Sequence, residues 1–294
     1  MQLLEDGMES LTYDTWMSLR DEHASLLQPR VDAHLQRRSC GEKHPVHDFL
    51  FEYYSFRPAQ LMRWSPGVGI VLENTDIDDW SWGPFETYQN KNSVWLNPHK
   101  FLHSRIESAQ WILSLLKEIE VRAPQFACHG LHEWAMVVDE GDIRHTQLPL
   151  RLSHDAIVTL VKSQSLCCTH YDAFRFFSQN ARPWNRHQLN PGSRINMEQR
   201  GCLHTNMDLY KWAYKFYPWI SSEIIRAAFN LAWDIRIIDM RASPYDVSRF
   251  NLEAIPIETE EGRRQYELEQ KRLSEKSIHI RRMLSEAYEK LLGL

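Results

Sequence analysis

The sequence predicts a mainly α single domain over residues 1–294 with a small β-sheet (α+β), and three observations predict it. Apolar residues recur at helical spacing along much of the chain, strand patterns are few and short, and no internal repeat is visible. Hydrophobic residues make up 43% of the chain and charged residues 25%, which suits a globular protein with one sizeable core.

Helices account for most of the predicted elements. Ser104 and Glu107 form a capping box ahead of a helix that is apolar on two sides and ends at Pro124. Apolar stripes predict further helices within 45–53, within 153–161 with Ser153 as its cap, within 207–217 and over 222–240. Residues from about 259 to 292 predict a long charged amphipathic helix with the stripe Tyr266, Leu273, Ile280, Leu284 and Leu291.

Strand signals are confined to three short runs. Residues 69–72 are apolar, and residues 134–138 and 148–152 are expected to pair across the turn-like segment 139–142. The stretches 73–98 and 178–200 are rich in turn-forming residues and are expected to be loops. Long ordered loops are often functional.

The composition indicates a cytoplasmic protein. Its five cysteines form no CxxC pair, which favours reduced thiols over a disulfide framework. We expect no signal peptide and no membrane contact, because neither a basic start nor a long apolar run is present. We also infer no obligate protein partner. The net charge of −5 argues weakly against a general nucleic-acid coat protein.

One segment is nevertheless basic. Residues 175–211 hold six Lys and Arg against two Asp and Glu, a local charge of +4. This indicates either an electrostatic footprint for a polyanion or an ordinary solvated loop.

Three clusters combine polar side chains with aromatic rings, at 129–134, 168–177 and 204–212. Burying such polar groups is costly unless they are paired, so the clusters predict one polar site walled by rings and suited to a flat ligand such as a nucleobase. Asp172 is the first choice for a catalytic carboxylate, since an aromatic environment can raise its pKa. The alternative is a structural Asp that binds Arg175 or a backbone amide.

The other clusters leave more than one interpretation open. His170 would point the same way as Asp172 if the stretch were extended. Asp208 is favoured as the partner of Thr205 in a capping box, while Asn206 could read the edge of a base. His129, His132, Glu133, His170, Asp172 and His204 could form a mixed metal site, but their spacing fits no standard pattern. We therefore expect no metal and no other cofactor.

Five stretches resemble a bacterial family usually named 3-methyladenine DNA glycosylase. They are HPVHDFLFEYYSFRP (44–58), HGLHEWAM (129–136), THYDAFRFF (169–177), GCLHTNMDLYKW (201–212) and DMRASPYD (239–246). The resemblance covers about residues 30–290. The family is also similar to anti-phage DNA glycosylases that remove modified bases, notably α-glucosylated hydroxymethylcytosine, from viral DNA.

The resemblance implies a monofunctional DNA glycosylase that binds DNA carrying modified bases and leaves an abasic site. The expected catalytic residues are Asp172 and His170, with Glu133 and His132 beside them. The expected base-binding residues are Asn206, His204, Tyr53, Tyr54, Trp134, Phe174 and Asp48. The expected phosphate contacts are Arg57, Arg175, Arg182, Arg186, Lys211 and Arg241.

Two alternatives to a glycosylase stay open. One is a metal-dependent His/carboxylate enzyme acting on a small molecule or nucleoside. The other is a non-catalytic protein that binds modified DNA.

Overall fold

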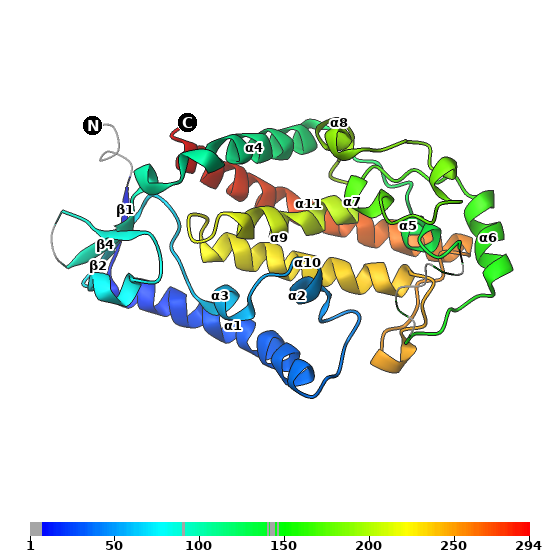
Figure 1. Cartoon of the computed structure of the whole chain (residues 1–294), viewed down its shortest axis with the longest axis horizontal. Helices are drawn as coiled ribbons and strands as arrows, with labels where there is room; N and C mark the ends of the chain where they lie inside the picture. Colours follow the sequence, from blue (N-terminus) through cyan, green and yellow to red (C-terminus); the bar gives the residue numbers. More distant parts are fainter. Residues whose placement is uncertain (1–7, 90–91, 140, 142–144, 146) are drawn as a thin grey trace.

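Three helices that lie side by side form the centre of the molecule (Figure 1). They are α9 (Leu203–Lys215), α10 (Ser222–Ala242) and α11 (Glu260–Leu292). Helix α4 (Ile106–Val121) packs against α11, and α1 (Tyr13–Ser39) packs against α10. This computed structural model describes residues 8–89, 92–139, 141, 145 and 147–294. Helices take 58% of the structure and strands 6%, which confirms the predicted mainly α class.

The long helices form where the apolar stripes predict them. Ser221 caps α10 by accepting a hydrogen bond from the Ile224 amide (3.4 Å), and the helix ends just before Pro244. Thr259 caps α11 by accepting from the Gly262 amide (3.0 Å). All five residues of the predicted α11 stripe are buried. These caps and stripes explain why the sequence pattern alone predicts the helices α10 and α11.

A small mixed sheet lies at one end of the molecule (Figure 1). Its strand order is β1-β2-β4-β3, with β1 and β2 parallel and the other pairs antiparallel. The strands are β1 (Glu9–Leu11), β2 (Ile70–Glu73), β3 (Phe85–Thr87) and β4 (Ser93–Leu96). The strand at 69–72 is confirmed. The loop expected over 73–98 is wrong in part, because Val94 and Leu96 are fully buried in a strand.

The remaining helices are short, and most lie at the other end of the molecule or beside the cleft described below. They are α2 (Phe49–Tyr53), α3 (Pro58–Met62), α5 (Leu131–Ala135), α6 (His154–Ser163), α7 (Tyr171–Phe174) and α8 (Arg194–Met197). Ser153 caps α6 as predicted, by accepting from the Ala156 amide (3.4 Å).

Several local predictions are wrong for identifiable reasons. Residues 134–138 belong to α5 and the turn after it, and Leu150 makes only an isolated bridge to Tyr245, so the predicted strand pair does not form. Residues 140 and 142 of its predicted turn lie outside the described residues. No side chain caps α4, so the Ser104–Glu107 box is absent.

Helix α1 has no counterpart among the predictions. Its buried positions include His23 and His34, and Pro29 lies inside it, so neither its hydrophobicity nor its composition is typical of a core helix.

Two general expectations concern the cysteines and membranes. All five cysteines are free thiols. Within the described residues, none of the helices combines the length and the apolar character that crossing a bilayer requires.

We expect Gly262→Ala to destabilise the fold by about 1–3 kcal/mol, the usual range for overpacking. An added Cβ would lie 2.0 Å from the carbonyl oxygen of Pro256. Chemical denaturation of the variant measures the loss. Glu261→Ala at the neighbouring exposed position is the control, and equal stability of the two variants would contradict the packing described here.

Candidate functional site

An open cleft of about 710 Å³ lies beside α9, opposite the segment that follows α2. Aromatic side chains supply much of its lining, and five cations line it as well. The rings are Tyr53, Tyr54, Phe56, Trp212, Tyr214 and Tyr217, and the cations are Arg105, Arg175, Arg194, Lys211 and Lys215. Among the described residues that line the cleft, Asp172 is the only carboxylate.

Asp172 lies on α7 and is surrounded by cations. Its Oδ1 accepts a hydrogen bond from Nη2 of Arg194 (2.7 Å), and its Oδ2 accepts one from Nζ of Lys211 (3.0 Å). Nε of Arg175 lies 3.3 Å from Oδ1. Burial by itself would raise the pKa of Asp172, but Lys211 and Arg194 outweigh burial, and the pKa lies below its ordinary value. The sequence-based expectation of a raised pKa is therefore corrected, and Asp172 is ionised at neutral pH.

Asp208 forms a second carboxylate layer behind Asp172. It accepts hydrogen bonds from the Tyr54 hydroxyl (2.9 Å) and from Nζ of Lys211 (3.4 Å), so Lys211 bridges the two carboxylates. Because α9 begins at Leu203, Asp208 lies inside the helix, and the predicted capping box with Thr205 is wrong. Burial opposes ionisation of Asp208, but Lys211 and His170 hold its pKa well below the ordinary range.

His170 orients this layer and does not line the cleft. Its Nδ1 accepts a hydrogen bond from the Ala173 amide (3.2 Å) and so caps α7. Nδ1 therefore carries no proton, and Nε2–H donates to Asp208 (3.3 Å). This side chain is 2% exposed, so its predicted role as a proton donor to a base lacks a direct path.

A smaller inner cavity of about 70 Å³ adjoins the cleft, and Tyr53 and Asp172 line both. Glu133, His204 and Arg236 also line the inner cavity. The site thus continues from an open cationic cleft, past Asp172, into a space with room for roughly two water molecules.

Glu133 and Asp172 share this inner cavity but differ in charge. Burial and the neighbouring Asp239 raise the pKa of Glu133 to about 7. Burial lowers the pKa of His204 to about 3, so its ring is neutral. The cavity therefore holds one carboxyl group that is ionised and one that still carries its proton in about half of the molecules near neutral pH, a division that suits acid/base chemistry.

Asp239 fixes the far wall of the inner cavity. It accepts hydrogen bonds from Nε2 of His132 and from Nη1 of Arg236, each at 3.0 Å. Arg236 also lies 3.8 Å from Glu133. Buried pairing with Arg236 compensates the charge of Asp239.

Among the residues that the structure describes, two groups of side chains have ligand atoms close enough for a metal ion. They are His132, Glu133, His204 and Asp239, and separately His170, Asp172 and Asp208. Arg236 already binds the first group, and Lys211 and Arg194 already bind the second. A divalent ion would have to compete with these protein cations, so we assign neither group as a metal site.

Several predicted site residues are structural instead. Trp134 is 0% exposed and donates its indole N–H to the carbonyl of Ala242 (2.8 Å), so no ring face is available to a base. Asn206 is also fully buried: its amide donates to the carbonyl of Arg200 (2.8 Å), and its oxygen accepts from Arg281 (2.6 Å). Their predicted base-binding roles are corrected accordingly.

Three more predicted residues lie away from both cavities. Phe174 is buried against Phe177. Asp48 accepts hydrogen bonds from Arg37 (3.1 Å) and His34 (2.9 Å), which makes it a buried ion-pair residue. His132 is held between Asp239 and Cys128.

Some of the predicted phosphate contacts line the cleft, and the others are bound within the fold or lie outside the cleft. Arg175 and Lys211 line the cleft. Arg182 donates to the carbonyls of Phe177 and Arg175, and Arg241 donates to the carbonyl of Glu253 (2.7 Å), so both are occupied within the fold. Arg57 and Arg186 are exposed but do not line the cleft.

Sequence reasoning missed Arg105, Arg194, Lys215, Arg236 and Asp239 as site residues. Arg194 lies in the basic 175–211 segment, which is the one signal that could have found it. Lys215 lies one helical turn after Lys211 on α9, and Arg236 and Asp239 pair with each other on α10, but their place at the site depends on how the helices pack.

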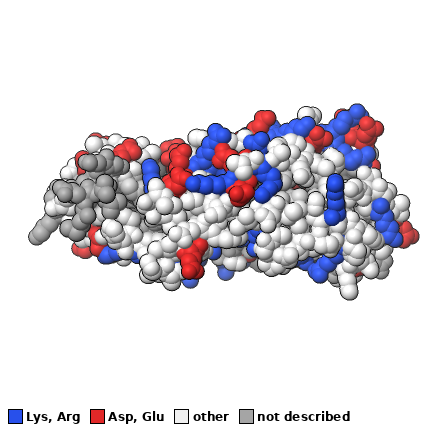
Figure 2. Space-filling model, turned by 90° about the horizontal axis from the view of Figure 1, so that it is seen from above, with Lys and Arg blue, Asp and Glu red and all other residues white. Residues whose placement is uncertain are grey.

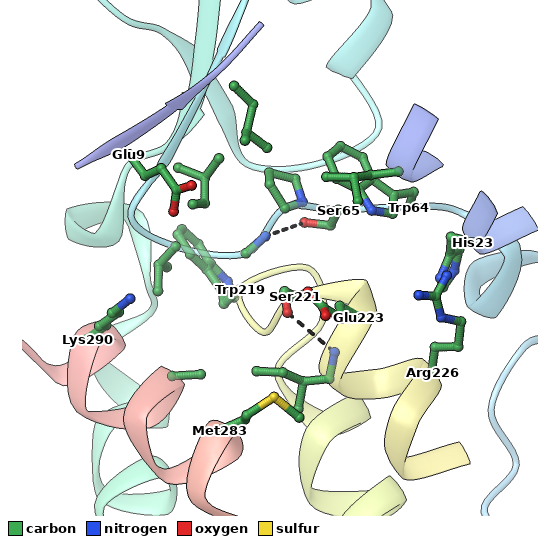
Figure 3. Close-up of a pocket in the computed structure, with 18 of the residues that line it drawn as sticks. Glu9, His23, Trp64, Ser65, Trp219, Ser221, Glu223, Arg226, Met283 and Lys290 are labelled. Carbon is green, nitrogen blue, oxygen red and sulfur yellow. Dashed lines mark hydrogen bonds between the residues drawn. The ribbon is translucent and has the colours of Figure 1, made fainter. Parts of the chain in front are cut away.

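The mixed charges on the face of the molecule seen from above are less suited to a polyanion than the cations of the cleft are. Figure 2 shows Lys and Arg intermixed with Asp and Glu on the face seen from above. Ion pairs between α4 and α11 contribute to this mixture, such as Lys117 with Glu289 (2.6 Å). A separate pocket of about 450 Å³ has Trp64 and Trp219 in its wall, but Glu9 and Glu223 also line it (Figure 3). Its carboxylates disfavour DNA, so the cleft is the candidate site.

Comparisons of the chain with protein-family models, with curated proteins and with solved structures find no match. The glycosylase resemblance therefore remains an expectation from the five motifs.

We expect Asn206→Ala to cost about 2–3 kcal/mol of unfolding free energy, because Arg281 would lose a buried acceptor. Asn180→Ala is the control, since Asn180 is an exposed Asn whose amide bonds only to Asp139, and we expect a change under about 0.5 kcal/mol there. Urea denaturation measures both variants. A stable Asn206→Ala protein that had lost only ligand binding would restore the base-binding interpretation.

Proposed function

We propose that the protein is a monofunctional DNA glycosylase that hydrolyses the N-glycosidic bond of a modified nucleobase and leaves an abasic site. The observation that carries the proposal is the pairing of ionised Asp172 with Glu133, whose pKa is raised to about 7, around one cavity beneath a cleft lined by rings and cations. Rings and cations together suit a nucleotide, because bases stack on rings and phosphates bind cations.

The substrate base must leave the DNA stack to reach Asp172. The cleft, at about 710 Å³, has room for a base enlarged by a substituent such as the sugar of glucosylated hydroxymethylcytosine. Tyr53, Tyr54 and Phe56 offer their rings to the extruded base. Arg175 and Lys215 lie where they can bind the flanking phosphates.

Cleavage of the N-glycosidic bond develops positive charge on the deoxyribose. The Asp172 carboxylate stabilises that charge and orients the attacking water. Glu133 supplies a proton to the leaving base through water in the inner cavity, a role that its raised pKa allows.

Lys211 supports the monofunctional assignment. Burial would lower its pKa, but Asp208 and Asp172 raise it above the ordinary value, so the amine stays protonated. A protonated amine does not form a Schiff base with the abasic sugar. Borohydride should therefore trap no protein–DNA adduct.

The primary test is incubation with DNAs of different base modification, followed by mass spectrometry of released bases with and without EDTA. Release that survives EDTA supports the proposal. Release that requires added metal favours the metal-dependent alternative, and binding without release favours a non-catalytic modified-DNA-binding protein.

Asp172→Asn should slow single-turnover base release by about 10²–10³-fold, the usual loss for a preorganised electrostatic group. The variant should still bind modified DNA, since the cations of the cleft remain. Release within about threefold of wild type would remove Asp172 from the chemistry. A parallel fall in melting temperature would indicate a structural role instead.

Glu133→Gln should reduce release by about 10²-fold or more, because the amide cannot donate the proton. In the wild-type protein, Glu133 loses its proton as the pH rises through about 7, so release should decline on the alkaline side. Rate–pH profiles measure this decline. An alkaline decline that persists unchanged in Glu133→Gln would assign the proton to another group.

Arg175→Ala and Lys215→Ala should each flatten the slope of the logarithm of the DNA-binding constant against the logarithm of the salt concentration. The expected change is that for the loss of about one phosphate contact. Arg186→Ala is the matched control from the same basic segment, because Arg186 lies outside the cleft. Fluorescence anisotropy over a range of salt concentrations gives the slopes. Equal slopes for Arg186→Ala and Arg175→Ala would extend the DNA footprint beyond the cleft.

A further inference from the structure

Glu198 is a buried carboxyl group behind the cleft that the mechanism above does not use. It follows α8 directly and is 0% exposed. Among the described residues, neither of its side-chain oxygens has a hydrogen-bond partner. A buried carboxyl without hydrogen bonds must be neutral or must be balanced by nearby cations.

The nearest cation is Arg194, which also binds the catalytic carboxylate. Nε of Arg194 lies 3.6 Å from Oε1 of Glu198, while Nη2 of the same guanidinium donates to Asp172 (2.7 Å). Nε has no hydrogen-bond partner within the described structure. Arg194 therefore lies between two carboxyl groups and gives Asp172 a single hydrogen bond, although guanidinium groups often bind carboxylates with two.

The other titratable neighbours of Glu198 lie on α7 and α9 and at two nearby cysteines. His170, from the start of α7, lies 3.8 Å away and donates Nε2–H to Asp208; burial alone would lower its pKa, but Glu198 and Asp208 raise it above the ordinary value. Asp208 and Lys211, from α9, stay charged, and burial keeps the thiols of Cys168 and Cys202 protonated. Burial and Asp208 raise the pKa of Glu198 to about 7, so the charge of Glu198 changes near neutral pH.

We propose that Glu198 is a positioning residue that, when ionised, holds the Nε edge of Arg194 and so prevents Arg194 from binding Asp172 with two nitrogens. The proposal rests on the proposed function. Once Glu198 is protonated, the guanidinium can turn further onto Asp172 and neutralise it more fully. Asp172 then has less charge to offer the developing cation on the sugar.

The rate–pH profile tests this role. Wild-type base release should decline on both sides of neutrality, with Glu198 responsible for the acid side and Glu133 for the alkaline side. Glu198→Gln should keep the alkaline decline, lose the acid-side decline and run about tenfold slower at the wild-type optimum, the loss expected for one charge-assisted contact. A variant that is slower at every pH but keeps the acid-side decline would show a merely structural role and overturn the proposal.

A second readout does not depend on activity. The ¹⁵N–¹H resonance of Arg194 Nε should shift between about pH 6 and about pH 8 in the wild-type protein and stay fixed in Glu198→Gln. Glu269→Gln is the control, because Glu269 is an exposed acid on α11 that pairs with Arg272. An Nε resonance that does not move in the wild-type protein overturns the proposal. A moving resonance without base release from any DNA supports the placement of Arg194 and overturns the proposed function alone.

A further variant covers the case in which Glu198→Gln does not fold. Arg194→Lys keeps a positive charge beside Asp172 but has no Nε edge for Glu198 to hold. It should therefore also lose the acid-side decline, and retention of that decline would overturn the proposal.

Discussion

The Lys211 ammonium is the interaction on which the rest of the candidate site depends. It lies between Asp172 and Asp208, two carboxylates that are almost wholly removed from water. Two such charges could not stay ionised side by side without a cation between them. The hydroxyl of Tyr54 and the ring of His170 bind Asp208 from other sides, and so the position of Lys211 also determines where these groups lie.

At the opposite wall of the inner cavity, the carboxyl group of Glu133 has too little positive charge beside it to keep its pKa low. There, Arg236 neutralises Asp239, and Glu133 is left without enough positive charge to hold it ionised. One cavity thus contains two carboxyl groups whose environments differ because cations are distributed unequally around them. The approach to this cavity is lined by aromatic rings together with cations.

Sequence patterns predict the long central helices and some of the residues that line the candidate site. The apolar stripes of α10 and α11 are long enough to identify the helices. Asp172 and Lys211, chosen from polar–aromatic clusters, and Tyr53, chosen as a base-binding ring, do line one cleft. Local sequence could not separate a core ring such as Trp134 from a cleft ring such as Tyr54, because both stand beside polar residues. Arg194 meets Asp172, and Asp239 meets His132, only when separate segments pack, and no spacing in the chain encodes those two contacts.

Helix α11 also constrains when the site can form during synthesis. Its 33 residues extend for about 50 Å along the molecule. Gln270 donates to the carbonyl of Gly201 (2.6 Å), Ser274 to that of Arg200 (2.8 Å), and Arg281 to the side chain of Asn206 (2.6 Å). These contacts seat the beginning of the helix that carries Asp208 and Lys211. A ribosome must therefore translate past residue 281 before all three contacts can anchor that helix and the candidate site it carries.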